Sequence, residues 1–203
     1  MDDTVNKETL TIAHYDNNAD SFWAGTKDHD VSQNIDSFLD ALPKKKGLDI
    51  LDLGCGPGRD LLHFKSLGHN PTGLDGSKRF CDMASKHSGC PTINDSFVNM
   101  TLSSGQFDGV FANASLFHVP RIELSNVLLK LFNCLKPGGV LFTSNPRGDS
   151  EGYNGQRYGY YMELDTFREL LERAGFELLH HYYRPEGKPI AQQPWLATVS
   201  RRA

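Results

Sequence analysis

The sequence has little of what marks secreted, membrane-spanning or zinc-binding proteins. Its 203 residues include four cysteines, with no C-x-x-C pair and no histidine at zinc spacing, so neither a disulfide framework nor a structural zinc site is expected. No apolar run approaches membrane-spanning length, and the polar, acidic start MDDTVNKETL does not resemble a secretory signal. We therefore expect a reduced, cytoplasmic protein with no metal and no membrane partner.

Positive charge is also scarce. The formal net charge is −4, whereas a nucleic-acid partner normally requires a basic face. The single compact basic run, Lys44-Lys45-Lys46, is interpreted as a solvated loop. With 38% hydrophobic and 23% charged residues, the chain has the composition of one ordinary globular domain.

From residue 48 onward, short apolar segments alternate with amphipathic helical ones. Such alternation is typical of an α/β fold, a doubly wound and mostly parallel sheet with helices on both faces. Ligands of these sheets bind outside the carboxyl ends of the strands. The expected strands are residues 48–53, 71–75, 90–97, 107–113, 140–145, 176–183 and 194–200.

The first 46 residues have a different pattern. Apolar residues at helical spacing predict a helix from Val31 to Leu42, ended by Pro43, with Asp30 as its cap. The preceding polar segment nevertheless carries three aromatic residues, Tyr15, Phe22 and Trp23. We interpret residues 1–46 as a helical lid segment and residues 47–203 as the ligand-binding domain.

The segment ILDLGCGPGRD, residues 50–60, places three glycines between an expected strand and an expected helix. Glycines let the backbone turn sharply and approach a ligand, and the helix that follows directs its free N–H groups at that ligand. The spacing G-x-G-x-G, with Arg59 after it, departs from the dinucleotide fingerprint. Asp52 could meet an ammonium group, and Asp75 is suited to bind ribose hydroxyls. Taken alone, the loop could also serve packing, with Asp75 capping the next helix.

Five motifs in order give the chain a clear resemblance. LDLGCGPG, GLDGS, NDSF, FDGVFANASLFHV and LKPGGVLFTSN make residues 46–200 similar to the class I S-adenosylmethionine-dependent methyltransferases. The resemblance implies a seven-stranded Rossmann-like sheet whose last strand is antiparallel. It also implies S-adenosylmethionine as cofactor and S-adenosylhomocysteine as product.

The resemblance implies roles for individual residues as well. Gly54, Cys55 and Gly56 would line the amino-acid end of the cofactor, and Asp75, with Gly76 and Ser77 beside it, would bind the ribose. Asp95 and Ser96 or Phe97 would meet the adenine, and Asn113 would lie near the sulfonium. Together with Asp52, and with Tyr15 and Trp23 from the lid, these are the expected cofactor-binding residues.

Residues outside the shared motifs decide the acceptor. His118 and Arg147 are candidate catalytic residues. His118 could be a general base or a pocket-wall residue, and Arg147 could bind a carboxylate or phosphate or form a surface ion pair. Two further segments are rich in aromatic residues. GQRYGYYMELD contains Tyr158, Tyr160 and Tyr161 in what we interpret as a glycine-rich loop, and HHYYRPEGKP with QQPWL adds more, including Trp195. These aromatics could cage a ligand or belong to the core, and we take Tyr158 as a candidate catalytic residue.

We therefore expect a methyltransferase, a monomer or homodimer, that modifies an oxygen, nitrogen or sulfur atom of a small molecule. The sequence NASLF lacks the Pro-Pro-aromatic signature of amino-group DNA methyltransferases, and no basic arm is present. A protein or RNA methyltransferase and a non-catalytic, cofactor-binding regulatory protein remain alternatives at this point. A dinucleotide-dependent oxidoreductase is a third.

Overall fold

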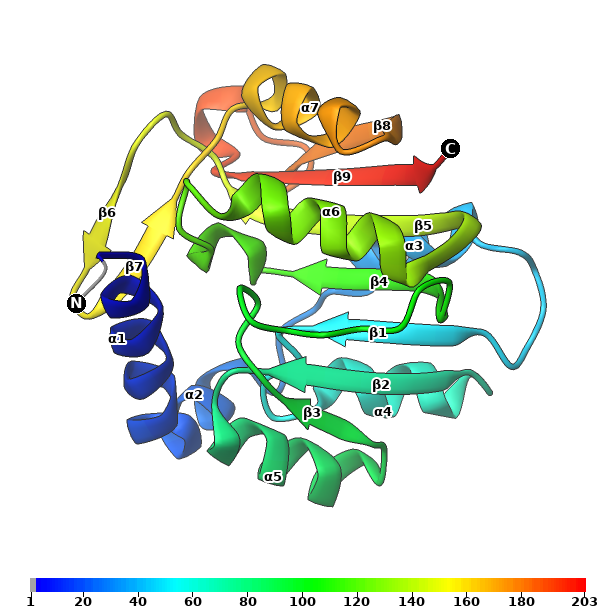
Figure 1. The fold of residues 1–203 in the computed structure, drawn as a ribbon, viewed down its shortest axis with the longest axis horizontal. Coiled ribbons are helices and arrows are strands. Elements are labelled where there is room, and N and C mark those ends of the chain that lie inside the picture. The colour runs from blue at the N-terminus through cyan, green and yellow to red at the C-terminus, as the bar shows by residue number, and fades with distance from the viewer. Residues whose placement is uncertain (1–2) are drawn as a thin grey trace.

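The computed structural model describes residues 3–203, with side chains from residue 6 onward, and contains a seven-stranded sheet (Figure 1). The strand order is β3-β2-β1-β4-β5-β9-β8, and only β9 runs antiparallel to its neighbours, β5 and β8. The predicted doubly wound sheet with an antiparallel last strand is confirmed. The strands are β1 (Asp49–Leu53), β2 (Asn70–Asp75), β3 (Thr92–Asn94), β4 (Phe107–Asn113), β5 (Leu135–Pro146), β8 (Phe176–Arg184) and β9 (Trp195–Arg202).

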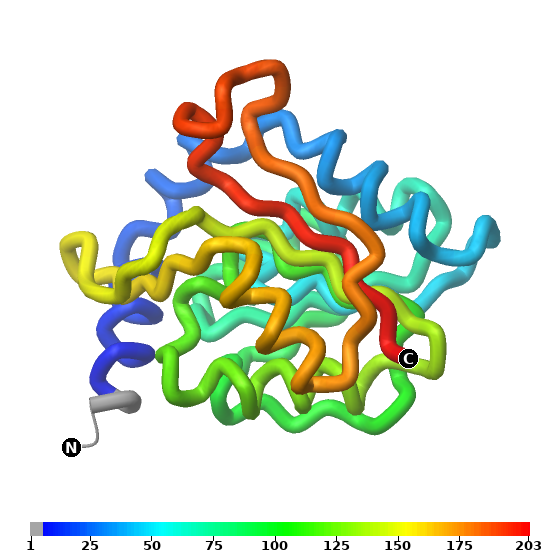
Figure 2. Tube along the Cα trace, turned by 90° about the horizontal axis from the view of Figure 1, so that it is seen from above, coloured from blue at the N-terminus to red at the C-terminus, as the bar shows by residue number. Residues whose placement is uncertain are grey.

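Helices cover both faces of the sheet, and Figure 2 shows α3 on the side opposite α6 and α7. Successive side chains of a strand point to opposite faces. Leu51 and Leu53 therefore pack in the core under α6 and α7, whereas Ile50 packs with Phe38 of α3 and Phe64 of α4. The helices are α3 (Ser32–Ala41), α4 (Arg59–Ser66), α5 (Lys78–Ser88), α6 (Leu124–Cys134) and α7 (Leu164–Arg173).

The first 46 residues divide into two parts. Helix α3 is part of the core, because Phe38 is fully buried and packs on Phe111 and Phe142 of the sheet. Helices α1 (Asp3–Asn17) and α2 (Ala19–Thr26) instead lie across the carboxyl ends of the strands (Figure 1). Only α1 and α2 therefore occupy the position that a lid requires.

The interpretation of GQRYGYYMELD as an aromatic loop was wrong. Strands β6 (Glu151–Asn154) and β7 (Arg157–Tyr160) form an antiparallel hairpin, and β7 lies beside α1 in both views (Figures 1 and 2). Tyr158 and Tyr160, two positions apart on one face, are buried in the core. The glycines conceal this two-residue period, because Gly159 stands between the tyrosines and Gly155 is in the turn.

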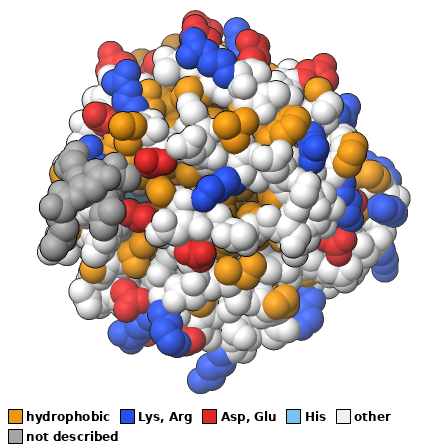
Figure 3. Space-filling view, viewed as in Figure 1, with side chains coloured by type: hydrophobic (Ala, Val, Ile, Leu, Met, Phe, Trp, Pro, Cys, Tyr) orange, Lys and Arg blue, Asp and Glu red, His pale blue; other side chains and the backbone are white. Residues whose placement is uncertain are grey.

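The surface carries both signs of charge. Figure 3 shows Lys and Arg interspersed with Asp and Glu over the visible face, with no extended patch of one sign. Within the described residues, no helix is both long enough and apolar enough to cross a bilayer.

Candidate active site

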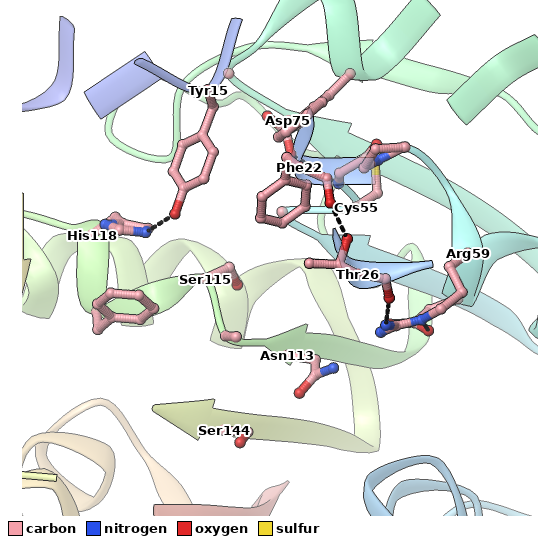
Figure 4. Close-up of a pocket in the computed structure, with 18 of the residues that line it drawn as sticks. Tyr15, Phe22, Thr26, Cys55, Arg59, Asp75, Asn113, Ser115, His118 and Ser144 are labelled. Atoms are coloured by element: carbon pink, nitrogen blue, oxygen red, sulfur yellow. Dashed lines mark hydrogen bonds and ion pairs between the residues drawn. The ribbon is translucent and has the colours of Figure 1, made fainter. Parts of the chain in front are cut away.

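A cavity of about 670 Å³ opens at the carboxyl ends of β1, β2, β4 and β5 (Figure 4). This is the edge where doubly wound sheets bind ligands. Helices α1 and α2 form one wall, and the chain after β4, strand β7 and the β8–β9 region form others. The predicted site residues that line it are Tyr15, Trp23, Gly54, Cys55, Gly56, Asp75, Gly76, Ser96, Phe97, Asn113 and His118.

The glycine loop connects the end of β1 to the start of α4 and contacts the neighbouring strand β2. Gly54, Gly56 and Gly58 all have positive φ, at +77°, +51° and +92°. The Gly54 N–H donates to the Leu74 carbonyl at 2.7 Å, which ties the start of the loop to β2. A Cβ on Gly54 would lie 2.4 Å from the Ser115 Cβ, so only glycine fits there.

Replacing Gly58 by alanine should lower the free energy of unfolding by more than about 2 kcal/mol. The new Cβ would lie 2.7 Å from the Ala84 Cα, a backbone atom that cannot rotate away. The control is Gly105→Ala, where φ is also positive at +62° but no atom lies within 4 Å, and where a loss of about 1 kcal/mol is expected. Urea unfolding measures both, and equal losses would contradict the close packing of α4 on α5.

Asp75 ends β2 and uses both carboxylate oxygens. Oδ2 accepts the Gly56 N–H at 3.0 Å, and Oδ1 accepts the Ser77 N–H at 2.9 Å. Burial raises the Asp75 pKa to about 6, against the effect of these two hydrogen bonds. The carboxylate thus joins the glycine loop to the start of α5 and lies at the cavity wall, where further lone pairs can accept ligand hydroxyls.

A second carboxylate lies beneath the loop. Asp52 is 2% exposed and does not line the cavity, and its Oδ2 has no hydrogen-bond partner among the described residues. Burial and the nearby charge of Asp60 raise the Asp52 pKa well above its usual range. Asp60 itself is paired with Arg59 at 2.7 Å, and Arg59 also donates to the Thr26 carbonyl of α2 at 3.0 Å. An unpaired buried oxygen of this kind is suited to a cationic ligand group.

Of four other predicted cofactor residues, two line the cavity and two lie outside its lining. Ser96 and Phe97 reach the cavity, but Asp95 does not, and its Oδ1 accepts the Ser96 N–H at 2.8 Å. Ser77 is buried and caps α5 by accepting the Phe80 N–H, while its hydroxyl donates to Asp16 of α1 at 2.7 Å.

The side chain of Asn113, at the end of β4, is held in place by a series of hydrogen bonds. Its Oδ1 accepts from the Nδ2 of fully buried Asn34 at 2.9 Å, and the Asn34 Oδ1 accepts the Tyr182 hydroxyl at 2.9 Å. This chain of bonds fixes the amide of Asn113 at the cavity wall. The next residue, Ala114, has φ +59°, a strained conformation for a residue with a Cβ and one that recurs at functional sites.

His118 follows β4 and connects the core domain to α1. Its Nδ1 lies 2.6 Å from the Tyr158 carbonyl oxygen, which can only accept, so Nδ1 carries the proton. Nε2 then accepts the Tyr15 hydroxyl at 2.8 Å (Figure 4). Burial lowers the His118 pKa to about 4, which keeps the ring neutral near pH 7.

Two predicted catalytic side chains lie away from the cavity. Tyr158 is 1% exposed, and its hydroxyl donates to Glu151 at 2.8 Å, so its side chain does not reach the site, whereas its backbone contacts the lining residues His118 and Thr11. Arg147 pairs with Glu163 and donates to the carbonyls of Ile190 and Gln193 at 3.0 and 2.9 Å. These bonds hold the Arg147 guanidinium against the β8–β9 connection.

Several lining residues were not predicted as site residues. They include Glu8, Phe22, Phe80, Phe117, Arg157 and Arg184. Trp195, for which both a ligand cage and the core were open, also lines the cavity. The sequence contained a signal for Arg157, because this residue lies in the tyrosine-rich segment GQRYGYYMELD. It contained none for Glu8, which lines the cavity because α1 lies across it. No cluster of three or more metal-ligating side chains occurs in residues covered by the structure.

The donor set fits an adenosyl ligand with an amino-acid tail. The cavity wall carries the Asp75 carboxylate, which is suited to a diol, and the backbone of Gly54 and Gly56, where a side chain on Gly54 would collide with Ser115. The orphaned Oδ2 of Asp52 is buried close to this loop, outside the cavity lining.

Comparisons with known proteins give a consistent result. Residues 24–181 match the family model described as a methyltransferase domain. The sterol 24-C-methyltransferase of Aspergillus fumigatus is 26% identical over 159 residues, which cover 68% of this chain and 42% of that protein. The Yarrowia lipolytica sterol 24-C-methyltransferase is 31% identical over 173 residues, covering 73% of this chain and 44% of the relative. The chain thus spans less than half the length of the curated relatives it matches.

A solved structure extends the likeness to the whole fold. The Burkholderia thailandensis 1,6-didemethyltoxoflavin-N1-methyltransferase, bound to 1,6-didemethyltoxoflavin and S-adenosylhomocysteine, superposes with a TM-score of 0.79. The match covers 100% of this chain and 92% of the other at 19% identity.

Proposed function

This chain belongs to the class I S-adenosylmethionine-dependent methyltransferases, and we propose that it transfers a methyl group to an oxygen, nitrogen or sulfur nucleophile of a small molecule. The observation that carries the small-molecule proposal is the position of α1 and α2 across the cavity. A cavity of about 670 Å³ lies in the range of small-ligand sites, and these helices restrict access to a nucleic acid or a folded protein.

Bound S-adenosylmethionine supplies a methyl group on a positively charged sulfur. We assign Asp75 to the ribose hydroxyls, Ser96 and Phe97 to the adenine side, and Asn113 to the sulfonium end. The backbone of Gly54–Gly56 approaches the amino-acid end. A positive charge bound there would favour the ionised form of Asp52, the buried carboxyl two positions before Gly54. Methyl transfer is an in-line displacement, so these residues act mainly by orientation.

Tyr15 and His118 are proposed to contact the acceptor. The Tyr158 carbonyl fixes the His118 tautomer, so that the lone pair of Nε2 faces the Tyr15 hydroxyl. A proton released by the acceptor reaches Nε2 through that hydroxyl. A nucleophile without a proton needs only the orienting effect of the pair.

Helices α1 and α2 are proposed to act as the lid. They are attached to the rest of the domain by polar contacts and by the packing of Tyr15 and Phe22 on Phe80 of α5. The polar contacts include the Tyr15–His118 bond, the Ser77–Asp16 bond and an ion pair between Arg79 and Asp20, and contacts of this kind can open more readily than a packed core. A lid of this kind would exclude water after the ligands bind.

Incubation with S-adenosylmethionine labelled in the methyl group and a dialysed extract plus its small-molecule filtrate tests the proposal. Label is expected in one or a few small molecules, together with stoichiometric S-adenosylhomocysteine. Label in protein or RNA would contradict the acceptor class. Tight S-adenosylhomocysteine binding without any labelled product would favour a regulatory binding protein, and binding of NADH instead would favour an oxidoreductase.

A further inference from the structure

Three arginines line the cavity, and only one has a carboxylate partner. Arg59 is paired with Asp60 at 2.7 Å. For Arg157 and Arg184, no carboxylate of the described residues lies within the 4.0 Å ion-pair distance. A guanidinium is always charged near neutral pH, so the cavity holds two positive charges that the protein itself does not neutralise by direct pairing.

The carboxylates of the cavity are already engaged elsewhere. Each of them is hydrogen-bonded to backbone N–H groups or to Arg59, and none forms an ion pair with Arg157 or Arg184 among the described residues, although the charge of Asp30 acts on Arg184 at longer range. The engaged carboxylates are Glu8 with Val98, Asp30 with Ser32, Asp60 with Arg59, and Asp75 with Gly56 and Ser77.

Arg157 lies next to the proposed catalytic pair. It is the first residue of β7, and its guanidinium carbon is 6.0 Å from the ring centroid of Tyr15. Its charge also contributes to lowering the His118 pKa, after the larger effect of burial. An anionic group bound by Arg157 would therefore place the rest of an acceptor beside the Tyr15 hydroxyl.

An aromatic wall extends from this point toward Arg184. The ring of Phe117 is 3.9 Å from that of His118 and 6.4 Å from that of Trp195, centroid to centroid. Trp195 pairs with Arg184 across β8 and β9, and Arg184 donates to the Asp30 carbonyl at 3.3 Å. Flat apolar surface thus lies between the two cations.

We propose that the methyl acceptor is an organic anion whose carboxylate or phosphate group binds Arg157, with an unsaturated body against Phe117 and Trp195. This inference rests on the proposed methyltransferase function and deepens it. Arg157 shares its cavity with the binding site for a cationic cofactor, and like charges in one low-dielectric cavity repel. An anionic acceptor offsets both charges and forms charge-assisted hydrogen bonds to the guanidinium.

Three probes of similar size test the charge preference: benzoate, phenyl phosphate and neutral benzamide. Their binding is measured by tryptophan fluorescence at saturating S-adenosylhomocysteine, after calorimetry has established that this product binds. At least one anion is expected to bind the wild-type protein at least tenfold more tightly than benzamide does. Comparison of the two anions distinguishes a carboxylate site from a phosphate site.

The same titrations on variants assign the preference to a residue. Arg157→Gln should remove the preference for anions over benzamide, and Arg157→Lys should keep part of it. Arg173→Gln, at an exposed position of α7, is the control and should leave the preference unchanged. Arg184→Gln measures how much Arg184 contributes to the preference for anions. Melting temperatures within a few degrees of wild type show that the variants fold.

Equal binding of benzamide and the anions, binding of neither anion, or an unchanged preference in Arg157→Gln would overturn the inference while leaving the methyltransferase proposal intact. Failure of S-adenosylhomocysteine itself to bind would instead overturn the proposed function, and the inference with it. The calorimetry that precedes the probes separates these two failures.

Discussion

Replacing Asp75 by alanine is expected to weaken S-adenosylhomocysteine binding by about 100-fold or more. Two ribose hydroxyls donating to one carboxylate contribute about 3 kcal/mol together, since hydrogen bonds to charged groups are worth about 1.5–3 kcal/mol each. The alanine also removes the acceptor of the Gly56 and Ser77 N–H groups, so the loop loses its support from β2. Calorimetric titration with S-adenosylhomocysteine measures the effect.

Two variants show whether the effect is specific. Asp75→Asn keeps the shape and one acceptor oxygen, so an intermediate loss is expected. Asp82→Ala, on the exposed side of α5 where Asp82 forms an ion pair with Lys78, should leave the affinity unchanged. A dissociation constant for Asp75→Ala within threefold of wild type would remove Asp75 from the ligand site.

The wild-type affinity should also depend on pH through the same carboxylate. The pKa of Asp75 is raised to about 6, and the charged form is the better acceptor for hydroxyls. As the pH falls below about 6, a proton must be released for binding, so the affinity should drop by roughly tenfold per pH unit. Asp75→Asn should be insensitive to pH over this range.

The cofactor side of the site could be predicted because its signals are local in sequence. A strand, three glycines and the start of a helix specify the loop within residues 50–60, and the carboxylate at the end of the next strand lies on the same sheet edge. Backbone geometry alone brings these groups together. The loop requires positive φ values at positions 54, 56 and 58, and glycine adopts such values readily because it has no Cβ.

The acceptor side could not be predicted in the same way. Arg147 and Arg157 lie ten positions apart, and the sequence favoured Arg147 as the anion-binding residue because it follows an expected strand, whereas Arg157 carried no such signal. The structure separates them because the carbonyls of Ile190 and Gln193 bind the Arg147 guanidinium, and these lie more than 40 residues further along the chain. The Tyr15–His118 bond joins residues 103 positions apart, a separation at which periodicity and motif spacing carry no information.

Replacing His118 by alanine is expected to lower kcat by about 100-fold while changing S-adenosylhomocysteine affinity by less than threefold. The ring lies beyond the residues assigned to the cofactor, and its two nitrogens are committed to the Tyr158 carbonyl and the Tyr15 hydroxyl. Loss of the ring therefore removes the Tyr15–His118 pair that is proposed to contact the methyl acceptor, and it leaves the glycine loop and Asp75 in place. The measurement uses the acceptor identified by labelling, and equal losses of turnover and cofactor affinity would make His118 a wall residue of the cofactor pocket.

Tyr15→Phe separates proton transfer from packing, because it keeps the ring contacts with Phe22 and Phe80 and removes only the hydroxyl. A proton-transfer route through Tyr15 predicts a loss close to that of His118→Ala, whereas packing alone predicts nearly full activity. The free-enzyme pKa of about 4 makes His118 a weak base. An anion bound at the neighbouring Arg157 would raise that pKa, since a nearby negative charge favours the imidazolium. At saturating cofactor, the acid limb of kcat should therefore lie at higher pH than that of kcat/KM for the acceptor, and both limbs should disappear in His118→Ala.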